Sequence, residues 1–362
     1  MEKKEKKMEK KMEKKNIPDH SMEMITPVKV ALDRLNSLPF IAQRTPEWHE
    51  LRKKVFTASE YASCFKLTED VISPFVRYFK RTDFLASPRK SAGSGSLAAL
   101  VKKKLGLTAP FEGNSFTRFG NQYEPVAGII YQQIHGTELR EYGLIPHPEI
   151  EHLGASPDGC TLEGILVEIK CPSSRVPDGT VPFEYWCQMQ LQLACCDLSY
   201  CDFFDARFVE IEDKETWKER ARADKAPVGD PRFHRYGFML QSQDGEFIYA
   251  GRDVVTVEDF EAWEAVTLER EPGAKRFMYY LHDFHLVRVE RDRTWFRKRV
   301  PEIQAAWDQV CELRQKMTDG DPLPQCVRGR PSRALEIPDE GEDSRGERRR
   351  AARFLACGEC LA

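Results

Sequence analysis

The chain has 362 residues, of which 41% are hydrophobic and 31% charged, and its formal net charge at pH 7 is −3. This composition is typical of a globular protein with a sizeable core, and no apolar run reaches the roughly 18 residues that a transmembrane helix needs. The charged N-terminus lacks the apolar stretch of a signal peptide. We therefore expect an intracellular protein, in the cytoplasm or nucleus, whose eleven cysteines are mainly reduced.

The two ends of the chain have compositions that cannot bury a core. Residues 1–28 begin with the charged repeat MEKKEKKMEKKMEKK, and residues 318–362 are rich in Pro, Gly and charged residues. We expect both to be flexible tails and residues 29–317 to form one continuous globular domain. Within that domain residues 211–276 are less patterned, and we interpret them as an insertion. The motif CGEC in the C-terminal tail is a lone CxxC, which is weak support for metal or redox chemistry.

A basic segment lies near the start of the predicted domain. Residues 44–104 hold 13 Lys and Arg against six Asp and Glu. This surplus indicates either a localised surface for a polyanion or a set of solvated helix faces, and charge alone favours neither. For Lys102–Lys104 we expect a solvated face, with DNA contact as the alternative. The stretch 46–65 predicts two helices separated by a turn, the second beginning with a capping box of Thr57 and Glu60.

The remaining elements follow in an order typical of an α/β protein. The sequence predicts, in chain order, an amphipathic helix over 116–135 ended by Gly136, two or three strands between 141 and 171, a helix over 183–196, a strand over 198–208, a strand over 285–292 and a closing helix over 295–317. The buried stripe of the first of these helices would contain Ala127, Ile130, Tyr131 and Ile134. This alternation predicts a mixed central sheet flanked by helices.

The stretch LGASPDGCTLEGILVEIKCP, residues 153–172, carries the clearest chemical signal. Over 165–171 every second residue is apolar and the positions between include Glu168 and Lys170, which predicts a half-buried strand. Glu168 and Lys170 then project from one face, and Asp158 lies just upstream across a glycine turn. Two carboxylates and an ammonium group so placed suit a divalent cation and the hydrolysis of a phosphodiester. The alternative is an exposed strand face with an ion pair worth at most about 1 kcal/mol.

Four sequence blocks together resemble a known nuclease group. The SPDG and EIK segments resemble the PD-(D/E)XK nucleases. WHELRKKVFTAS, FGNQYEPVA and YWCQMQLQL resemble the N-terminal, helical and post-strand motifs of the phage lambda exonuclease and YqaJ-type viral recombinase (alkaline exonuclease) group, in the same order. The blocks span residues 48–193, while 211–276 and both tails lie outside the resemblance. It implies a restriction-endonuclease-like core with a mixed central β-sheet flanked by helices.

Residue by residue, the resemblance implies a metal site on this strand. The implied ligands, the last through its backbone carbonyl, are Asp158, Glu168, Glu124 and Ile169. Lys170 would position or activate the attacking water, and Gln188 would contribute from the following helix. The alternative for Gln188 is a polar stripe shared with Gln192, one turn away. An ordinary solvated helix residue is the alternative for Glu124.

The resemblance also implies a pocket for a 5′-terminal phosphate, formed by Arg52, Ser59 and Ser156. The chemistry agrees, because a guanidinium forms two parallel bonds to phosphate oxygens and the amides of a first helical turn favour anions. In the alternatives, Arg52 pairs with Glu47 or Glu50 and Ser59 supplements the helix cap.

The resemblance implies a Mg²⁺-dependent 5′→3′ DNA exonuclease, for which Mn²⁺ could substitute, encoded by a virus or mobile element. It would act at free ends of double-stranded DNA, leave a 3′ single strand, and pass it to a single-strand annealing protein during recombination. The group forms trimers, so a homo-oligomer is expected, without membrane contact. Two alternatives are an endonuclease with the same metal site and a DNA-binding or assembly protein with a vestigial site. The complete acidic and lysine set argues against the last.

Overall fold

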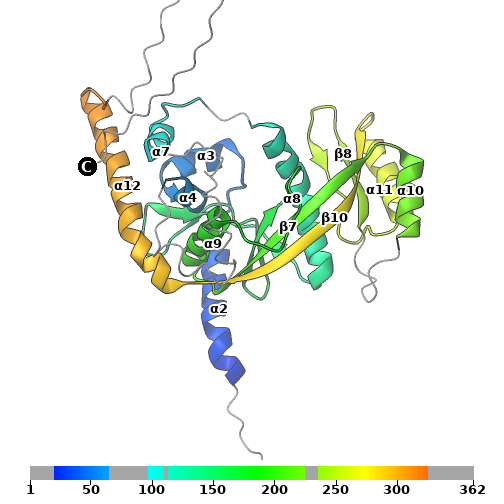
Figure 1. The fold of residues 1–362 in the computed structure, drawn as a ribbon, viewed down its shortest axis with the longest axis horizontal. Helices are drawn as coiled ribbons and strands as arrows, with labels where there is room; N and C mark the ends of the chain where they lie inside the picture. The colour runs from blue at the N-terminus through cyan, green and yellow to red at the C-terminus, as the bar shows by residue number, and fades with distance from the viewer. Residues whose placement is uncertain (1–19, 65–96, 110–112, 225–234, 325–362) are drawn as a thin grey trace, which may run out of the picture. The chain divides into compact units, whose positions relative to one another are not determined.

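The computed structural model describes residues 20–64, 97–109, 113–224 and 235–324 (Figure 1). The helices are α2 (His20–Ser37), α3 (Pro46–Lys53), α4 (Tyr61–Cys64), α7 (Leu97–Lys104), α8 (Ser115–His135), α9 (Phe183–Cys196), α10 (Lys214–Ala223), α11 (Val257–Arg270) and α12 (Arg293–Asp319), with a short 3-10 turn η1 (Ala58–Glu60). Most of both predicted tails, including the CGEC motif, lies outside the described residues, so the tails stay a prediction.

Ten strands form two sheets in the described part of the chain. They are β1 (Phe56–Thr57), β2 (Leu139–Arg140), β3 (Ile145–Pro146), β4 (Leu153–Ala155), β5 (Gly159–Thr161), β6 (Ile165–Lys170), β7 (Tyr200–Ile211), β8 (Tyr236–Gln241), β9 (Phe247–Ile248) and β10 (Lys275–Glu290). The larger sheet has the order β2-β5-β6-β7-β10-β8-β9, in which only β6 and β7 pair in parallel. The smaller sheet has the order β1-β4-β3. The predicted mixed α/β fold is confirmed.

Strand β6 is buried on both faces, so the prediction of a half-buried strand is wrong. Val167 and Ile169 belong to one apolar cluster together with Val126 and Ala127 of α8. The opposite face carries Glu168, which is 0% exposed because α9 covers it and supplies its hydrogen-bond partners. Alternation in sequence indicated the two faces correctly, but it could not show that a helix lies over the polar one.

Helix α8 agrees closely with its prediction. Gly136 follows its last residue in a left-handed conformation with φ 61°, and its N–H bonds back to the carbonyl of Gln132. Glycine adopts this conformation without steric cost, which explains the end of the helix. Of the predicted stripe, Ala127, Ile130 and Tyr131 are buried, whereas Ile134 is partly buried.

The predicted pair of N-terminal helices is only partly correct. After α3 the chain forms the short strand β1, which pairs in parallel with β4, and then η1 and α4. The predicted capping box is present at the start of η1, where the carboxylate of Glu60 accepts a bond of 2.9 Å from the N–H of Thr57. Strand pairing with a distant segment cannot be read from local helical signals, which explains the difference.

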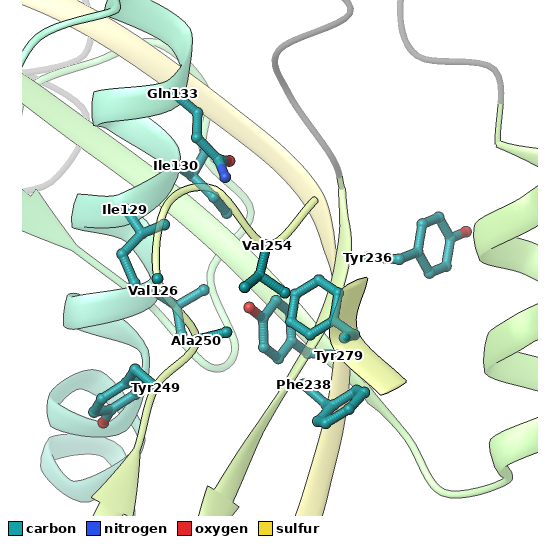
Figure 2. A pocket seen from close by; sticks show the side chains of 12 residues that line it. Val126, Ile129, Ile130, Gln133, Tyr236, Phe238, Tyr249, Ala250, Val254 and Tyr279 are labelled. Carbon is teal, nitrogen blue, oxygen red and sulfur yellow. The ribbon is translucent and has the colours of Figure 1, made fainter. Parts of the chain in front are cut away.

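Residues 211–276 form α10, β8, β9 and α11, and β8 pairs with β10 in the main sheet. A second apolar cluster lies here, centred on Trp217, Phe238 and Phe260. Where this segment faces α8, a cavity of about 20 Å³ is lined by apolar and aromatic side chains that include Tyr249 and Tyr279 (Figure 2). That volume suits about one water molecule. Within the described residues no helix is long and apolar enough to cross a membrane.

Candidate active site

Asp158, Glu168 and Lys170 lie together at the end of β6. Asp158 stands just before β5, and its Oδ2 accepts a bond of 2.7 Å from the backbone N–H of Ile169. Lys170 projects on the same side as Glu168 and donates to its Oε1, and also to the carbonyl of Ile169 at 3.1 Å. The antiparallel pairing of β5 with β6 brings the glycine turn back alongside this strand. The fold therefore places three of the predicted residues beside one another.

Two glutamines of α9 hold the buried carboxylate of Glu168. Gln188 Nε2 donates to Glu168 Oε1 at 2.8 Å, and Gln192 Nε2 donates to Oε2 at 2.6 Å. They are four residues apart, so they lie on the same face of the helix. Gln188 is thus at the site as predicted. The sequence indicated Gln192 only as part of a polar stripe. Its four-residue spacing from Gln188 is the signal that could have identified it as a second partner of Glu168.

Glu124 reaches the site from α8, but its immediate partner was not expected. Arg44 Nη2 lies 2.6 Å from Glu124 Oε2. Arg44 has φ 70°, a left-handed backbone conformation that is uncommon for a residue with a Cβ atom. The neighbouring residue Gln43 donates to the carbonyl of Pro157 at 3.0 Å, so this loop lies along the turn that carries Asp158. The sequence gives no local signal for a contact across 80 residues.

The three carboxylates influence one another electrostatically. Burial raises the pKa of Asp158 well above its ordinary value, and the nearby charges of Glu168 and Glu124 raise it further. Burial also raises the pKa of Glu124. Burial by itself would lower the pKa of Lys170, but the carboxylates of Glu168 and Asp158 outweigh it and raise that pKa above its ordinary value. Lys170 is therefore protonated, and its charge offsets part of the acidic cluster.

This donor set suits a divalent cation. Carboxylate and carbonyl oxygens are the ligands that Mg²⁺ prefers, and a cation relieves the mutual repulsion of buried carboxylates. In the described part of the chain, no three His, Cys, Asp or Glu side chains converge closely enough to hold a metal ion. Glu168 is paired with Lys170, and Glu124 is paired with Arg44. A bound cation would take the place of these two pairs.

Arg52 and Ser59 come together on the other side of this turn. Arg52 Nη2 donates to Ser59 Oγ and to Thr57 Oγ1, both at 3.2 Å. Ser156 is connected to Arg52 through Trp48, whose indole Nε1 lies 3.1 Å from Ser156 Oγ. Trp48 had no predicted role beyond its place in a motif. The three predicted phosphate ligands are therefore near one another, with Ser156 connected to Arg52 through the Trp48 side chain.

The buried carboxylate of Glu60 lies close to basic side chains of this region. Glu60 is paired with Lys104 at 2.9 Å and with Lys103 at 3.1 Å. Burial opposes ionisation of Glu60, but the two lysines hold its pKa below the ordinary value. Burial lowers the pKa of Lys104 to about 8, and its ammonium group also donates to the carbonyl of Arg52. The prediction of a solvated face for all three lysines is therefore wrong for Lys104, which is 4% exposed.

A cleft of about 430 Å³ opens beside Glu124 and the end of β6. Its walls include Glu124, Lys170, Tyr185 and Arg175. Tyr185 is partly buried, and the Lys170 ammonium lies 5.0 Å from its ring centroid. Arg175 forms two bonds to the buried carboxylate of Asp205 on β7. The cationic side chains of Lys170 and Arg175 therefore line the same cleft as the carboxylate of Glu124.

This chain is similar in sequence to known proteins. Residues 47–199 match the family described as the YqaJ-like viral recombinase domain. An uncharacterized protein of Acanthamoeba polyphaga mimivirus is 25% identical over 338 residues, which is 81% of this chain and 56% of the relative. The chain thus spans a little over half the length of that curated relative.

Solved structures with a similar chain include two exonucleases. An alkaline exonuclease from Laribacter hongkongensis is 21% identical, with a TM-score of 0.44, over 76% of this chain and 97% of that one. A phage related exonuclease from Haemophilus somnus 129PT is 16% identical, with a TM-score of 0.36, over 71% and 99%. The family match covers the residues that build the site, from α3 to the end of α9. Residues 47–199 are therefore similar to the YqaJ-like viral recombinase domain, and the predicted resemblance to the lambda exonuclease and YqaJ-type group is confirmed.

Proposed function

We propose that this chain is a Mg²⁺-dependent 5′→3′ DNA exonuclease that digests one strand of duplex DNA from a 5′-phosphorylated end. The observation that carries the proposal is the adjacency of two sites along one turn. Asp158 contacts β6 in the acidic cluster, and Ser156 contacts Trp48 of the helix that carries Arg52. Two residues of chain span at most roughly 7 Å, which is comparable to the spacing of neighbouring phosphates along a nucleic-acid strand. One nucleotide can therefore reach from the phosphate pocket to the acidic cluster.

The cation would be held by Asp158, Glu168, Glu124 and the carbonyl of Ile169. When bound, Mg²⁺, or Mn²⁺ in its place, supplies positive charge that stabilises the phosphate during in-line attack by water. Oxygen ligands of this kind match both ions. The fully buried environment of Glu168 fixes one ligand in place before the cation arrives.

The protein's own groups orient the reactants. Lys170 carries a positive charge at the mouth of the acidic cluster, where it can hold a water molecule or a phosphate oxygen. Gln188 fixes the Glu168 carboxylate through one oxygen. Arg52 and Ser59 present hydrogen-bond donors for a terminal phosphate, and a guanidinium suits phosphate oxygens. The pocket that selects the strand end and the acidic cluster that hydrolyses the bond are then held at a fixed distance from each other.

The decisive experiment incubates the purified protein with linear and circular duplex DNA, with and without Mg²⁺. An exonuclease digests only the linear DNA and only with the cation. Nicking or linearisation of the circle would favour the endonuclease alternative, and binding without cleavage of either form would favour a vestigial site. Strand-specific labels at each end establish direction, because 5′→3′ digestion releases a 5′ label first.

The role in recombination and the assembly state are part of the same proposal. By resemblance, the 3′ single strand passes to an annealing protein, and the chain assembles as a homo-oligomer, in particular a trimer. Light scattering after size-exclusion chromatography measures the mass of the assembly. Annealing of complementary strands in a reaction with and without a candidate annealing protein tests the transfer.

A further inference from the structure

Trp48 contacts both halves of the predicted phosphate pocket. It lies in the first turn of α3 and is 8% exposed. Its indole Nε1 donates to Ser156 Oγ at 3.1 Å, and the guanidinium carbon of Arg52 lies 4.4 Å from its ring centroid. One buried side chain therefore joins a helix at the start of the domain to the turn that carries Asp158.

The contact with Ser156 determines how that hydroxyl can bind an anion. A serine hydroxyl has one O–H donor and two acceptor lone pairs, whereas an indole N–H can only donate. Ser156 Oγ must therefore accept from Trp48. Its own O–H remains a donor, and a phosphate oxygen is an acceptor. The indole thus orients the hydroxyl for the ligand that the pocket is proposed to hold.

The ring also restrains the guanidinium group. Trp48 and Arg52 are four residues apart, a spacing that places both on one helix face. Arg52 is held by the ring on its face and through Nη2 by Ser59 and Thr57. A stacked guanidinium with one nitrogen bonded keeps its plane in one orientation. Because the Arg52 guanidinium is already ordered before DNA binds, less conformational entropy is lost when it binds a phosphate.

We propose that Trp48 is a positioning residue for end recognition: it unites Ser156 and Arg52 into one pocket and thereby sets the preference for a 5′-phosphorylated end. The inference rests on the proposed exonuclease function and adds to it the residue that couples the pocket to the acidic cluster. Because Ser156 and Asp158 are two residues apart, the same indole fixes the distance from the held phosphate to the acidic cluster.

The test compares Trp48→Phe and Trp48→Leu with the matched control Trp307→Phe. Phenylalanine keeps an aromatic face for Arg52 but has no N–H for Ser156, and leucine lacks both. Trp307 is also buried and also has an arginine over its ring, Arg314 at 5.2 Å, but it lies in α12. Initial rates are measured on linear duplexes with 5′-phosphate or 5′-hydroxyl ends. Affinity for both ends is measured in EDTA by fluorescence anisotropy.

Trp48→Phe should reduce the ratio of the two rates about three- to tenfold, as expected for the loss of one hydrogen bond. Trp48→Leu should reduce it further, and Trp307→Phe should leave it unchanged. In the background of Ser156→Ala, Trp48→Phe should cause little further loss, because both changes remove the same bond. The affinity ratio in EDTA should fall in the same order.

An unchanged ratio in the folded Trp48→Phe protein, or effects of Trp48→Phe and Ser156→Ala that simply multiply, would overturn the inference. Melting curves identify any variant that fails to fold. If Trp48→Leu does not fold, the rate ratio of Trp48→Phe alone decides the test. If the parent cleaves no DNA, the proposed function fails. The affinity ratio in EDTA still tests Trp48 in that case, since equal affinity of the parent for both ends overturns the pocket itself.

Discussion

Gln192 donates a hydrogen bond of 2.6 Å to Oε2 of Glu168, and both side chains are fully buried. A hydrogen bond to a charged group contributes about 1.5–3 kcal/mol. Gln192→Met should therefore lower kcat about ten- to a hundredfold and raise the Mg²⁺ concentration needed for half-maximal rate, because Glu168 loses one of its two amide donors. Steady-state kinetics over a Mg²⁺ titration measure both effects.

The control for Gln192 is its neighbour Gln190. This glutamine is also fully buried in α9, but it bonds to the carbonyl of Glu290 and the N–H of Asp292. Gln190→Met should lower the melting temperature with little effect on the Mg²⁺ titration of the folded protein. Equal shifts in the Mg²⁺ titration for both variants would show that Gln192 acts only through stability.

Asp158→Asn should abolish cleavage by orders of magnitude. A neutral amide binds Mg²⁺ poorly, whereas an asparagine oxygen can still accept from the N–H of Ile169 and preserve the turn. DNA affinity should survive, because it rests largely on Lys and Arg contacts to phosphates. Cleavage and filter binding are measured on the same preparation. Digestion at a rate comparable to the parent would rule out Asp158 as a ligand.

If Lys170 acts on the attacking water, Lys170→Ala should lower kcat far more than it weakens DNA binding, because such a contact is made chiefly in the transition state. Lys170→Arg should not restore the rate, because a planar guanidinium is larger and cannot take the position of the compact ammonium group. Lys214→Ala, which removes a lysine 3.6 Å from Glu264 and distant in sequence from the cleft, is the control. A kcat within a few-fold of the parent would make Lys170 structural.

Arg44→Gly should strengthen metal binding. Glycine adopts φ 70° readily, and the change removes the cation that competes for Glu124. Because this ion pair is partly exposed, we expect a modest effect of roughly three- to fivefold, consistent with at most about 1 kcal/mol for such a pair. Calorimetric titration with Mn²⁺ measures it.

Asp197→Gly is the control for Arg44. Asp197 also has a positive φ, of 55°, but it ends α9 and pairs with Arg291. It should change stability without changing Mn²⁺ affinity. Weaker Mn²⁺ binding by Arg44→Gly would contradict the competition argument.

Arg52→Ala should reduce the preference for 5′-phosphorylated ends about ten- to a hundredfold, because the lost contact is charge-assisted. The loss should come mainly from slower digestion of the phosphorylated duplex, since only that substrate loses a partner. Initial rates on both ends, at one salt concentration, measure the ratio. An unchanged ratio would place the phosphate elsewhere.

Local sequence patterns determined the elements that depend on neighbouring residues. The end of α8 at Gly136 follows from its glycine cap, and β6 follows from alternation. Asp158, Glu168 and Lys170 could be singled out because their spacing along the chain is itself the chemical motif. Local patterns did not predict β1 in the N-terminal segment, because this strand forms only by pairing with β4 about a hundred residues later.

Tertiary structure alone decided which groups these residues meet. Glu168 is buried because α9 covers its face of β6, and Glu124 meets Arg44 across 80 residues. Lys104 is buried, although it belongs to a run of lysines on α7, because it forms an ion pair with the buried carboxylate of Glu60. Sequence by itself indicated the candidate site residues, because their types and their spacing along the chain make up the motif. Packing decided their partners, charge states and exposure, because these depend on segments far away along the chain.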